Sequence, residues 1–121
     1  MSKKNIEKYI PKAMAVLNTE FSSGVIPSSY NGYISSFGAS IIQSGIKPTL
    51  ALFENKNAKT EENKQLLTSL ILKILDDNTN EESLLKYILN NSNDEQYIKQ
   101  QIMDISIAIK LSIRTFKLKK D

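Results

Sequence analysis

Apolar residues along the chain recur at steps of three and four, the spacing of one face of an α-helix, and strict alternation is almost absent. A first helix is expected from about Lys4 to Glu20. Pro11 interrupts its pattern, so we expect either a kink at this residue or a later start of the helix. The apolar stripe of this helix consists of Ile6, Tyr9, Ile10, Ala13, Met14 and Leu17.

Two further helices are predicted between the break at Ser22-Ser23-Gly24 and residue 53. Pro27-Ser28-Ser29 is expected to open the first of them, with a serine as its cap. Gly45 suits a left-handed residue that ends this helix. Pro48 suits the first turn of a short helix that follows. The apolar positions are Tyr30, Tyr33, Ile34, Phe37 and Ile41 in the longer helix and Leu50, Ala51 and Phe53 in the shorter one.

Three more helices are predicted in the second half of the chain. Thr60 is the expected cap of a helix over residues 61–75. Thr79 with Glu82, and Ser92 with Glu95, have the spacing of capping boxes before the last two helices. The inner positions are Leu67, Leu70, Ile71 and Ile74, then Leu84, Leu85, Ile88 and Leu89, then Ile98, Ile102, Ile105, Ile109, Ile113 and Phe116. The expected fold class is therefore all-α, a compact bundle of about six helices in one domain over residues 1–121.

Composition restricts the classes of function. The 121 residues suffice for one core, and 40% hydrophobic with 24% charged residues is typical of a globular chain. The chain has no cysteine and no histidine, which excludes disulfides, zinc held by thiolates and catalysis by a histidine base. The first residues are charged and lack the apolar segment of a secretory signal. We therefore expect a cytoplasmic protein that does not contact a membrane.

The acidic residues give little indication of catalysis. Three acidic pairs fall in the first turns of predicted helices, where negative charge complements the helix dipole: Glu61-Glu62, Glu81-Glu82 and Asp94-Glu95. Asp76-Asp77 falls at a helix end instead, and a magnesium site at this pair is a remote alternative. We expect no catalytic residue, no metal ligand and no cofactor.

A long segment of the chain, from Phe21 to Ile46, carries no charged residue. In the predicted helix inside this segment, serine, glycine and alanine stand opposite the aromatic stripe. Depletion of charge is typical of the centre of a protein interface, and small residues allow close approach of two backbones. The alternative is a helix enclosed on all sides by its own bundle. The aromatic candidates for subunit contact are Tyr30, Tyr33 and Phe37.

Basic residues gather toward both ends of the sequence, although the formal net charge is only +3. Lys4, Lys8 and Lys12 are four residues apart and share one face of the first predicted helix. Rows at this spacing can follow a phosphate backbone without reading bases, and the alternative is a solvated helix face. A second row of candidates lies on the last predicted helix, and one further lysine follows Gly45: Lys110, Arg114, Lys117 and Lys47.

The segment YISSFGASIIQSGIKPTLALFENK resembles a known family, the small helical subunit, conventionally the fifth, of the Cmr module in type III-B CRISPR effector complexes. Members carry a helix that ends in a Gln-x-Gly-like turn, followed by an apolar segment. Here the turn is Gln43-Ser44-Gly45, and the apolar segment is Leu50-Ala51-Leu52-Phe53. The resemblance adds Gln43, Gly45 and Phe53 to the candidate contact residues. The helices after residue 60 are similar only as helices.

The resemblance implies an all-helical, non-catalytic subunit of an RNA-guided antiviral complex. Small subunits of this family stack along the inside of the ribonucleoprotein and help to form the groove in which target RNA pairs with guide RNA. The implied partners are other Cmr subunits, copies of the chain itself, guide RNA and target RNA. The family motif does not place the lysines, so their assignment to RNA rests on charge spacing alone. The alternative function is a stand-alone helical adaptor or regulator that binds another protein and no nucleic acid.

Overall fold

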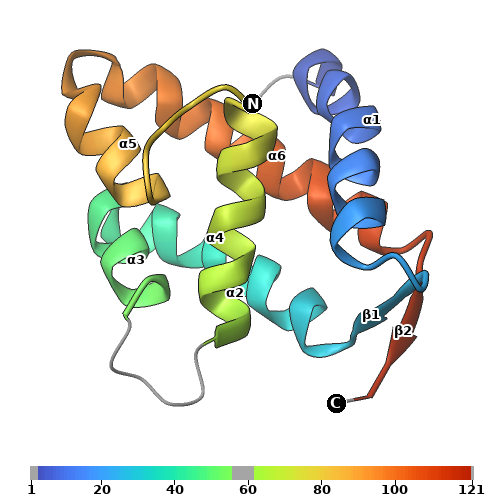
Figure 1. Cartoon of the computed structure of the whole chain (residues 1–121). Helices are drawn as coiled ribbons and strands as arrows, with labels where there is room; N and C mark the ends of the chain where they lie inside the picture. The colour runs from blue at the N-terminus through green and yellow to red at the C-terminus, as the bar shows by residue number, and fades with distance from the viewer. Residues whose placement is uncertain (1–2, 56–61, 121) are drawn as a thin grey trace.

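The computed structural model describes residues 3–55 and 62–120. In these residues the chain forms six α-helices, one short 3-10 helix and one pair of short strands (Figure 1). The elements in chain order are α1 Lys3–Glu20, β1 Val25–Pro27, α2 Ser29–Ser44, α3 Ile46–Phe53, α4 Glu62–Leu75, α5 Leu84–Asn90, η1 Ser92–Asp94, α6 Glu95–Ile113 and β2 Lys117–Lys119. The predicted all-α bundle of about six helices is confirmed.

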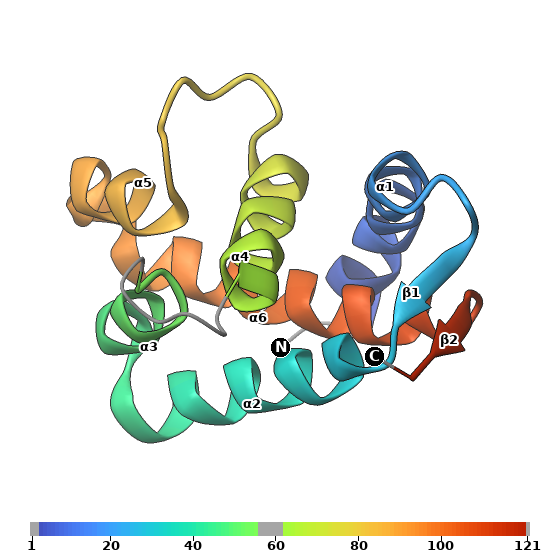
Figure 2. The same cartoon turned by 60° about the horizontal axis from the view of Figure 1, so that its bottom comes forward.

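Helix α6 is the centre of the bundle, because α1, α2 and α4 all pack against it. Figure 2 shows α6 running across the molecule, with α2 below it and with α1 and α4 above it. Helices α3 and α5 contact each other at the end of the bundle away from α1 (Figure 1). A helix covered on several sides needs apolar residues around most of its surface. Six isoleucines of α6 meet this need: Ile98, Ile102, Ile105, Ile109 and Ile113 are buried and Ile107 is half-buried.

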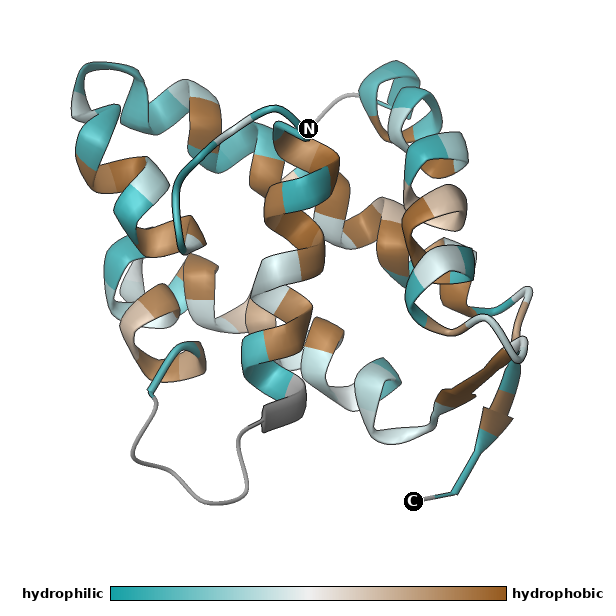
Figure 3. Ribbon diagram, in the orientation of Figure 1, coloured by the Kyte–Doolittle hydropathy of each residue, from teal (hydrophilic) through white to brown (hydrophobic). Residues whose placement is uncertain are grey.

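The core is one continuous cluster of aliphatic and aromatic side chains. The rings of Phe37 and Phe53 meet edge to face with centroids 5.2 Å apart, which joins α2 to α3. Phe21 and Tyr30 form a similar pair at 5.4 Å near the start of α2. In Figure 3 the hydrophobic positions of α4 and α6 lie where these helices cross, and the outer turns of α1 are hydrophilic.

Helix α1 continues through Pro11 from Lys3 to Glu20, so the predicted later start of this helix is wrong. Proline has no N–H to donate to the carbonyl four residues earlier, and its fixed φ suits a helix. Pro11 is exposed, so water can reach that carbonyl, and the apolar stripe of α1 holds the helix on either side of the residue.

The strands β1 and β2 were not predicted, and β2 corrects the expected end of the last helix. They pair in parallel with Val25 opposite Lys117 and Pro27 opposite Lys119. The Lys117 amide donates to the Gly24 carbonyl at 3.2 Å, and the Ser28 amide donates to the Lys119 carbonyl at 2.8 Å. Helix α6 therefore ends at Ile113, so the helical pattern predicted up to Phe116 runs too far.

Two predicted helix caps differ from those in the structure. The cap of helix α5 is Ser83 and not Thr79, and the Ser83 hydroxyl accepts a hydrogen bond from the Lys86 backbone amide at 3.2 Å. Ser92 lies in η1, and α6 follows Asp94. The predicted cap Thr60 lies outside the described residues. At the start of α2, Ser28 is the cap by position, and its side chain makes no capping hydrogen bond.

Candidate subunit and nucleic-acid interface

Helix α2 has one buried face and one exposed face. Its inner face is fully covered by the core through Tyr30, Ile34, Phe37 and Ile41. Its outer face is solvent-exposed and carries no charge: Asn31, Gly32, Ser35, Ser36, Ala39, Ile42, Gln43 and Ser44. The alternative of a helix enclosed on all sides is therefore wrong. Ile42 is the most exposed large hydrophobic side chain of the described residues, at 75%.

The aromatic candidates of the sequence lie mainly on the inner face of α2. Tyr30, Phe37 and Phe53 are at most 2% exposed, so their side chains belong to the core and not to an outer contact surface. Tyr33 is half-buried, and the ammonium of Lys64 lies 5.6 Å from its ring centroid. Of the six contact candidates, Gln43 is exposed on the outer face. The uncharged surface thus consists of small, polar and aliphatic residues.

The corner between α2 and α3 is fixed by Gly45 and two hydroxyls. Gly45 has φ 92° and ψ 169°, an extended conformation with positive φ that essentially only glycine adopts. The predicted position of the helix end is confirmed, although the residue is not in the left-handed helical region. The Thr49 hydroxyl donates to the Gly45 carbonyl at 2.8 Å and lies 2.7 Å from the Ser40 hydroxyl. These bonds set the angle at which the outer face of α2 meets α3.

The lysine row of α1 is on the surface. Lys4, Lys8 and Lys12 are exposed, and their spacing of four residues in a continuous helix places them along one face. The Lys8 ammonium lies 6.0 Å from the Tyr9 ring centroid. The predicted alignment of the three lysines is confirmed, and their contact with RNA stays a prediction.

The other basic candidates do not form the predicted second row. Lys110 is half-buried in the last turn of α6, and Arg114 is exposed just after that helix ends. Lys117 belongs to β2, so it cannot continue a helical face with the other two. Lys47 forms an ion pair with Glu95 at 2.9 Å, which joins α3 to the first turn of α6. The positive charge of Lys47 is therefore paired with a carboxylate of the same chain.

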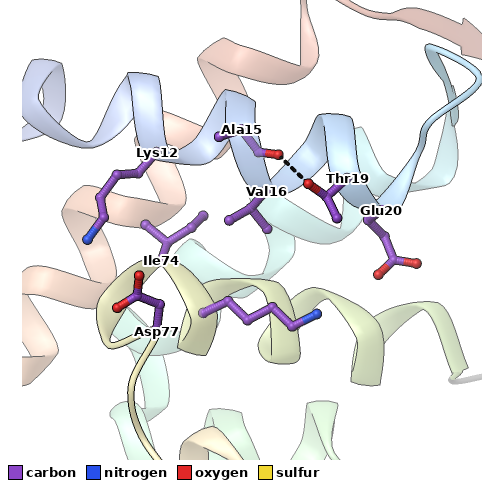
Figure 4. A pocket seen from close by; sticks show the side chains of 8 residues that line it. Lys12, Ala15, Val16, Thr19, Glu20, Ile74 and Asp77 are labelled. Carbon is purple, nitrogen blue, oxygen red and sulfur yellow. Dashed lines mark hydrogen bonds between the residues drawn. The ribbon is translucent and has the colours of Figure 1, made fainter.

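A groove of about 410 Å³ lies between α1 and α4 and was not predicted from the sequence. Its apolar lining comes from Ala15, Val16 and Ile74, and charged side chains surround it. Figure 4 shows Lys12 of α1 and Asp77, just after α4, on facing sides of the groove. The lysine row thus ends beside a surface of mixed charge.

In the acidic pair Asp76-Asp77, the Asp76 carboxylate accepts hydrogen bonds from neighbouring groups of the fold. The Asp76 carboxylate accepts a hydrogen bond from the Asn78 amide at 3.1 Å, and the Tyr87 hydroxyl donates to it at 3.5 Å. Burial, followed by the negative charge of Asp76, raises the pKa of the Tyr87 hydroxyl.

No group of three or more acidic, histidine or cysteine side chains suited to a metal ion occurs in residues 3–55 and 62–120. None of the described helices is long and apolar enough to cross a membrane.

Sequence reasoning also missed a polar site between α1 and α6. Asp104 is 2% exposed, although it stands in the isoleucine-rich segment of α6. Its carboxylate accepts a hydrogen bond from Gln100 at 3.2 Å, and Gln101 donates to the Tyr9 hydroxyl across the two helices at 3.2 Å. A signal was present in the sequence, since a charged residue inside an apolar helical run is unusual.

These features define a small helical protein whose surface offers an uncharged helix face and a row of lysines for contact with other molecules. The model of the family described as CRISPR-associated protein (Cas_Cmr5) matches residues 6–109. The chain belongs to this family, and it is therefore a subunit of a Cmr complex that associates with other subunits of that complex. The match includes the segment from Tyr30 to Phe53 that carried the resemblance. Comparisons with curated proteins and with solved structures gave no match.

Proposed function

We propose that this chain is a non-catalytic subunit of the type III-B Cmr complex that stabilises its assembly and contributes a basic surface to the groove for guide and target RNA. The lysine row of α1 contacts the RNA phosphates, and the uncharged outer face of α2 contacts a neighbouring subunit. The complex acts in antiviral defence in the cytoplasm, where its target RNA is found.

The observation that carries the RNA contact is the exposed row of Lys4, Lys8 and Lys12 on one face of α1. Helical residues four apart are about 6 Å from each other along the axis, at a rise of roughly 1.5 Å per residue. That distance is close to the separation of successive phosphates in an RNA strand. Three ammonium groups on one helix face can therefore neutralise neighbouring phosphates without reading the bases.

The subunit contact is supported by the composition of the outer face of α2. A surface helix ordinarily carries charged residues on its solvent side. Here an entire face of small, polar and aliphatic residues surrounds Ile42, and such a face loses little solvation energy when another protein covers it. A non-catalytic role is consistent with the absence of histidine and cysteine from the chain.

The test compares RNA affinity of the assembled complex that contains wild-type chain with that of a complex that contains the triple variant Lys4→Gln, Lys8→Gln and Lys12→Gln. Binding of labelled target RNA is measured at several salt concentrations. Each lost phosphate contact lowers the slope of log K against log salt by about 0.7 for a single strand. We expect weaker binding at low salt and a slope that is smaller by about 2.

The matched control replaces three other exposed lysines, Lys86→Gln, Lys119→Gln and Lys120→Gln, which removes the same charge from other surfaces. Its slope should remain closer to that of the wild type. Equal slopes for the α1 variant and the wild type would remove the lysine row from the RNA groove. The alternative of a protein-binding adaptor without nucleic acid would then be the better account of α1.

A further inference from the structure

The carboxylate of Asp104 is an unusual buried charge. It is 2% exposed on the side of α6 where α1 packs. Its hydrogen bond from the Gln100 side-chain amide, 3.2 Å long, comes from the same helix and from a neutral group. In the part of the chain that the structure describes, no lysine or arginine lies within 4.0 Å of this carboxylate.

A buried carboxylate without a cation is costly for the folded chain. Removing an ion from water costs several kcal/mol, and a single neutral hydrogen bond offsets only part of this. Buried charges in proteins are therefore normally paired. A positive charge from another molecule would offset this cost if it reached the carboxylate.

Asp104 faces a hollow that is open to solvent. The hollow has a volume of about 80 Å³ and is lined by side chains of α1 and α6, most of them polar: Asn5, Lys8, Tyr9, Tyr97, Gln100, Gln101 and Asp104. Gln100 and Gln101 donate their amide N–H groups to Asp104 and Tyr9, and each keeps a carbonyl oxygen as a hydrogen-bond acceptor. The site therefore offers acceptors around one negative charge.

Tyr97 completes the site from its rim. It lies in the first turn of α6, is 68% exposed and lines the same hollow as Asp104. An exposed aromatic ring beside a buried carboxylate suits a planar cation, which can pair with the carboxylate while it stacks on the ring.

We propose that the hollow at Asp104 receives the guanidinium group of an arginine from a neighbouring Cmr subunit. The guanidinium pairs with the Asp104 carboxylate, donates further hydrogen bonds to the glutamine carbonyls and lies against the face of Tyr97. Arginine fits better than lysine, because its planar group has five donors and a face that stacks on an aromatic ring. The inference rests on the membership of the chain in the Cmr complex and not on its contact with RNA.

An RNA base is the competing occupant, and three observations disfavour it. A base carries no positive charge, so it leaves the Asp104 charge uncompensated. The negative phosphate that accompanies each base would be repelled by the carboxylate. A volume of about 80 Å³ admits the end of one side chain and does not enclose a base. Lys8 also lines the hollow, and in the described residues its ammonium makes no ion pair with Asp104.

The first test is the variant Asp104→Asn. Asparagine keeps the oxygen that accepts from Gln100 and removes the charge. Without the desolvation of an unpaired charge, the isolated variant should have a Tm equal to or higher than that of the wild type. In titration of the chain into a Cmr complex that lacks it, the same variant should bind about 30-fold more weakly or worse, because the partner arginine loses its counterion.

The control is Asp94→Asn, which removes the same group from an exposed position at the start of α6. It should leave binding to the complex within about 2-fold, as expected for a surface charge. A lower Tm for Asp104→Asn would mean that the carboxylate serves the fold of the isolated chain, and would overturn the proposal. Unchanged binding of this variant to the complex would also overturn it.

The second test identifies the occupant. Tyr97 is replaced by the photo-crosslinking amino acid p-benzoylphenylalanine, the complex is assembled and irradiated, and the crosslinked species are digested and sequenced by mass spectrometry. A crosslink to an arginine-containing peptide of a subunit is expected. A crosslink to RNA would overturn the proposal in favour of a base. Neither result depends on the lysine variants of α1, so a failure of the RNA contact is distinguished from a failure of the arginine contact.

Discussion

The carboxylate of Glu54, at the end of α3, caps helix α5 by accepting hydrogen bonds from the backbone amides of Leu84 at 3.2 Å and Leu85 at 3.3 Å. The first amides of a helix have no partner within the helix. Glu54 satisfies two of them from a position 30 residues earlier in the chain. The start of α5 is therefore defined jointly by its local cap Ser83 and by a contact from another helix.

Glu54 predicts a pH dependence of stability. Burial raises the pKa of its carboxyl above the ordinary value of a glutamate, and the hydrogen bonds from Leu85 and Leu84 oppose this shift only partly. A carboxyl whose pKa is higher in the folded state binds more protons folded than unfolded. Its contribution to stability is therefore greatest below the unfolded pKa and falls as the pH rises through the folded pKa.

The variant Glu54→Gln removes this titration and keeps one acceptor oxygen. The free energy of unfolding of the wild type, relative to that of the variant, should be higher near about pH 4 than near about pH 7. Urea unfolding of both chains at the two pH values measures the difference. A second variant, Glu54→Ala, removes the cap and should lose about 1–2 kcal/mol at either pH. If the free energy of unfolding of the wild type, relative to that of Glu54→Gln, increased with rising pH, the raised pKa assigned to Glu54 would be wrong.

Gly45 should resist substitution because of its backbone and not for lack of space. A Cβ at this position would meet the Pro48 ring at 3.8 Å, an ordinary contact. The positive φ of 92° is nevertheless strained for any other residue. We expect Gly45→Ala to lower the free energy of unfolding by about 1–3 kcal/mol.

The control is Gly38→Ala, within α2. Gly38 has no positive φ, and a Cβ there would meet nothing within 4 Å. Alanine is favoured over glycine in a helix, so this variant should gain about 0.5–1 kcal/mol. Thermal unfolding of the two variants beside the wild type tests both signs. Equal losses at the two positions would show that the corner of α2 and α3 is not held by the conformation of Gly45.

The helices could be predicted because their apolar spacing is local. Ile34, Phe37 and Ile41 repeat at helical steps, and each is buried in the structure as that spacing requires. The strands β1 and β2 could not be predicted in the same way. Each has three residues, and the partner of Ile26 is Leu118, far away in the sequence. Pairing of this kind depends on the completed packing of α1 and α6, which no local pattern contains.

The same division holds for the candidate site: its features that follow from local helical spacing were predicted, and those that depend on packing between helices were not. The row of Lys4, Lys8 and Lys12 follows from helical periodicity, so it was found. The uncharged surface of α2 was found as a segment, but the aromatic residues chosen within it face inward, because large rings contribute most to the core. Asp104 was missed: its place inside the isoleucine-rich run was a signal, but the hollow and the hydrogen bonds around it depend on how α1 packs against α6.

The outer face of α2 gives a prediction that separates folding from assembly. Ile42 is 75% exposed, so Ile42→Glu should leave the Tm of the isolated chain nearly unchanged. If the uncharged face contacts another subunit around Ile42, a carboxylate at this position would have to be buried without a cation, which costs several kcal/mol. We expect the variant to be largely absent from the assembled complex, as measured by native mass spectrometry of complexes formed with an excess of the chain.

If the Ile42→Glu variant is absent from the assembled complex, two further variants show whether the cause is a lost contact of α2. Phe37→Ala, on the inner face of the same helix, should lower the free energy of unfolding by about 3–5 kcal/mol because it empties part of the core. Leu89→Glu places the same charge on another exposed hydrophobic residue, 52% exposed on α5. If Leu89→Glu enters the complex and Ile42→Glu does not, the contact lies on α2. Normal incorporation of Ile42→Glu would show that the uncharged face of α2 remains open to solvent in the complex.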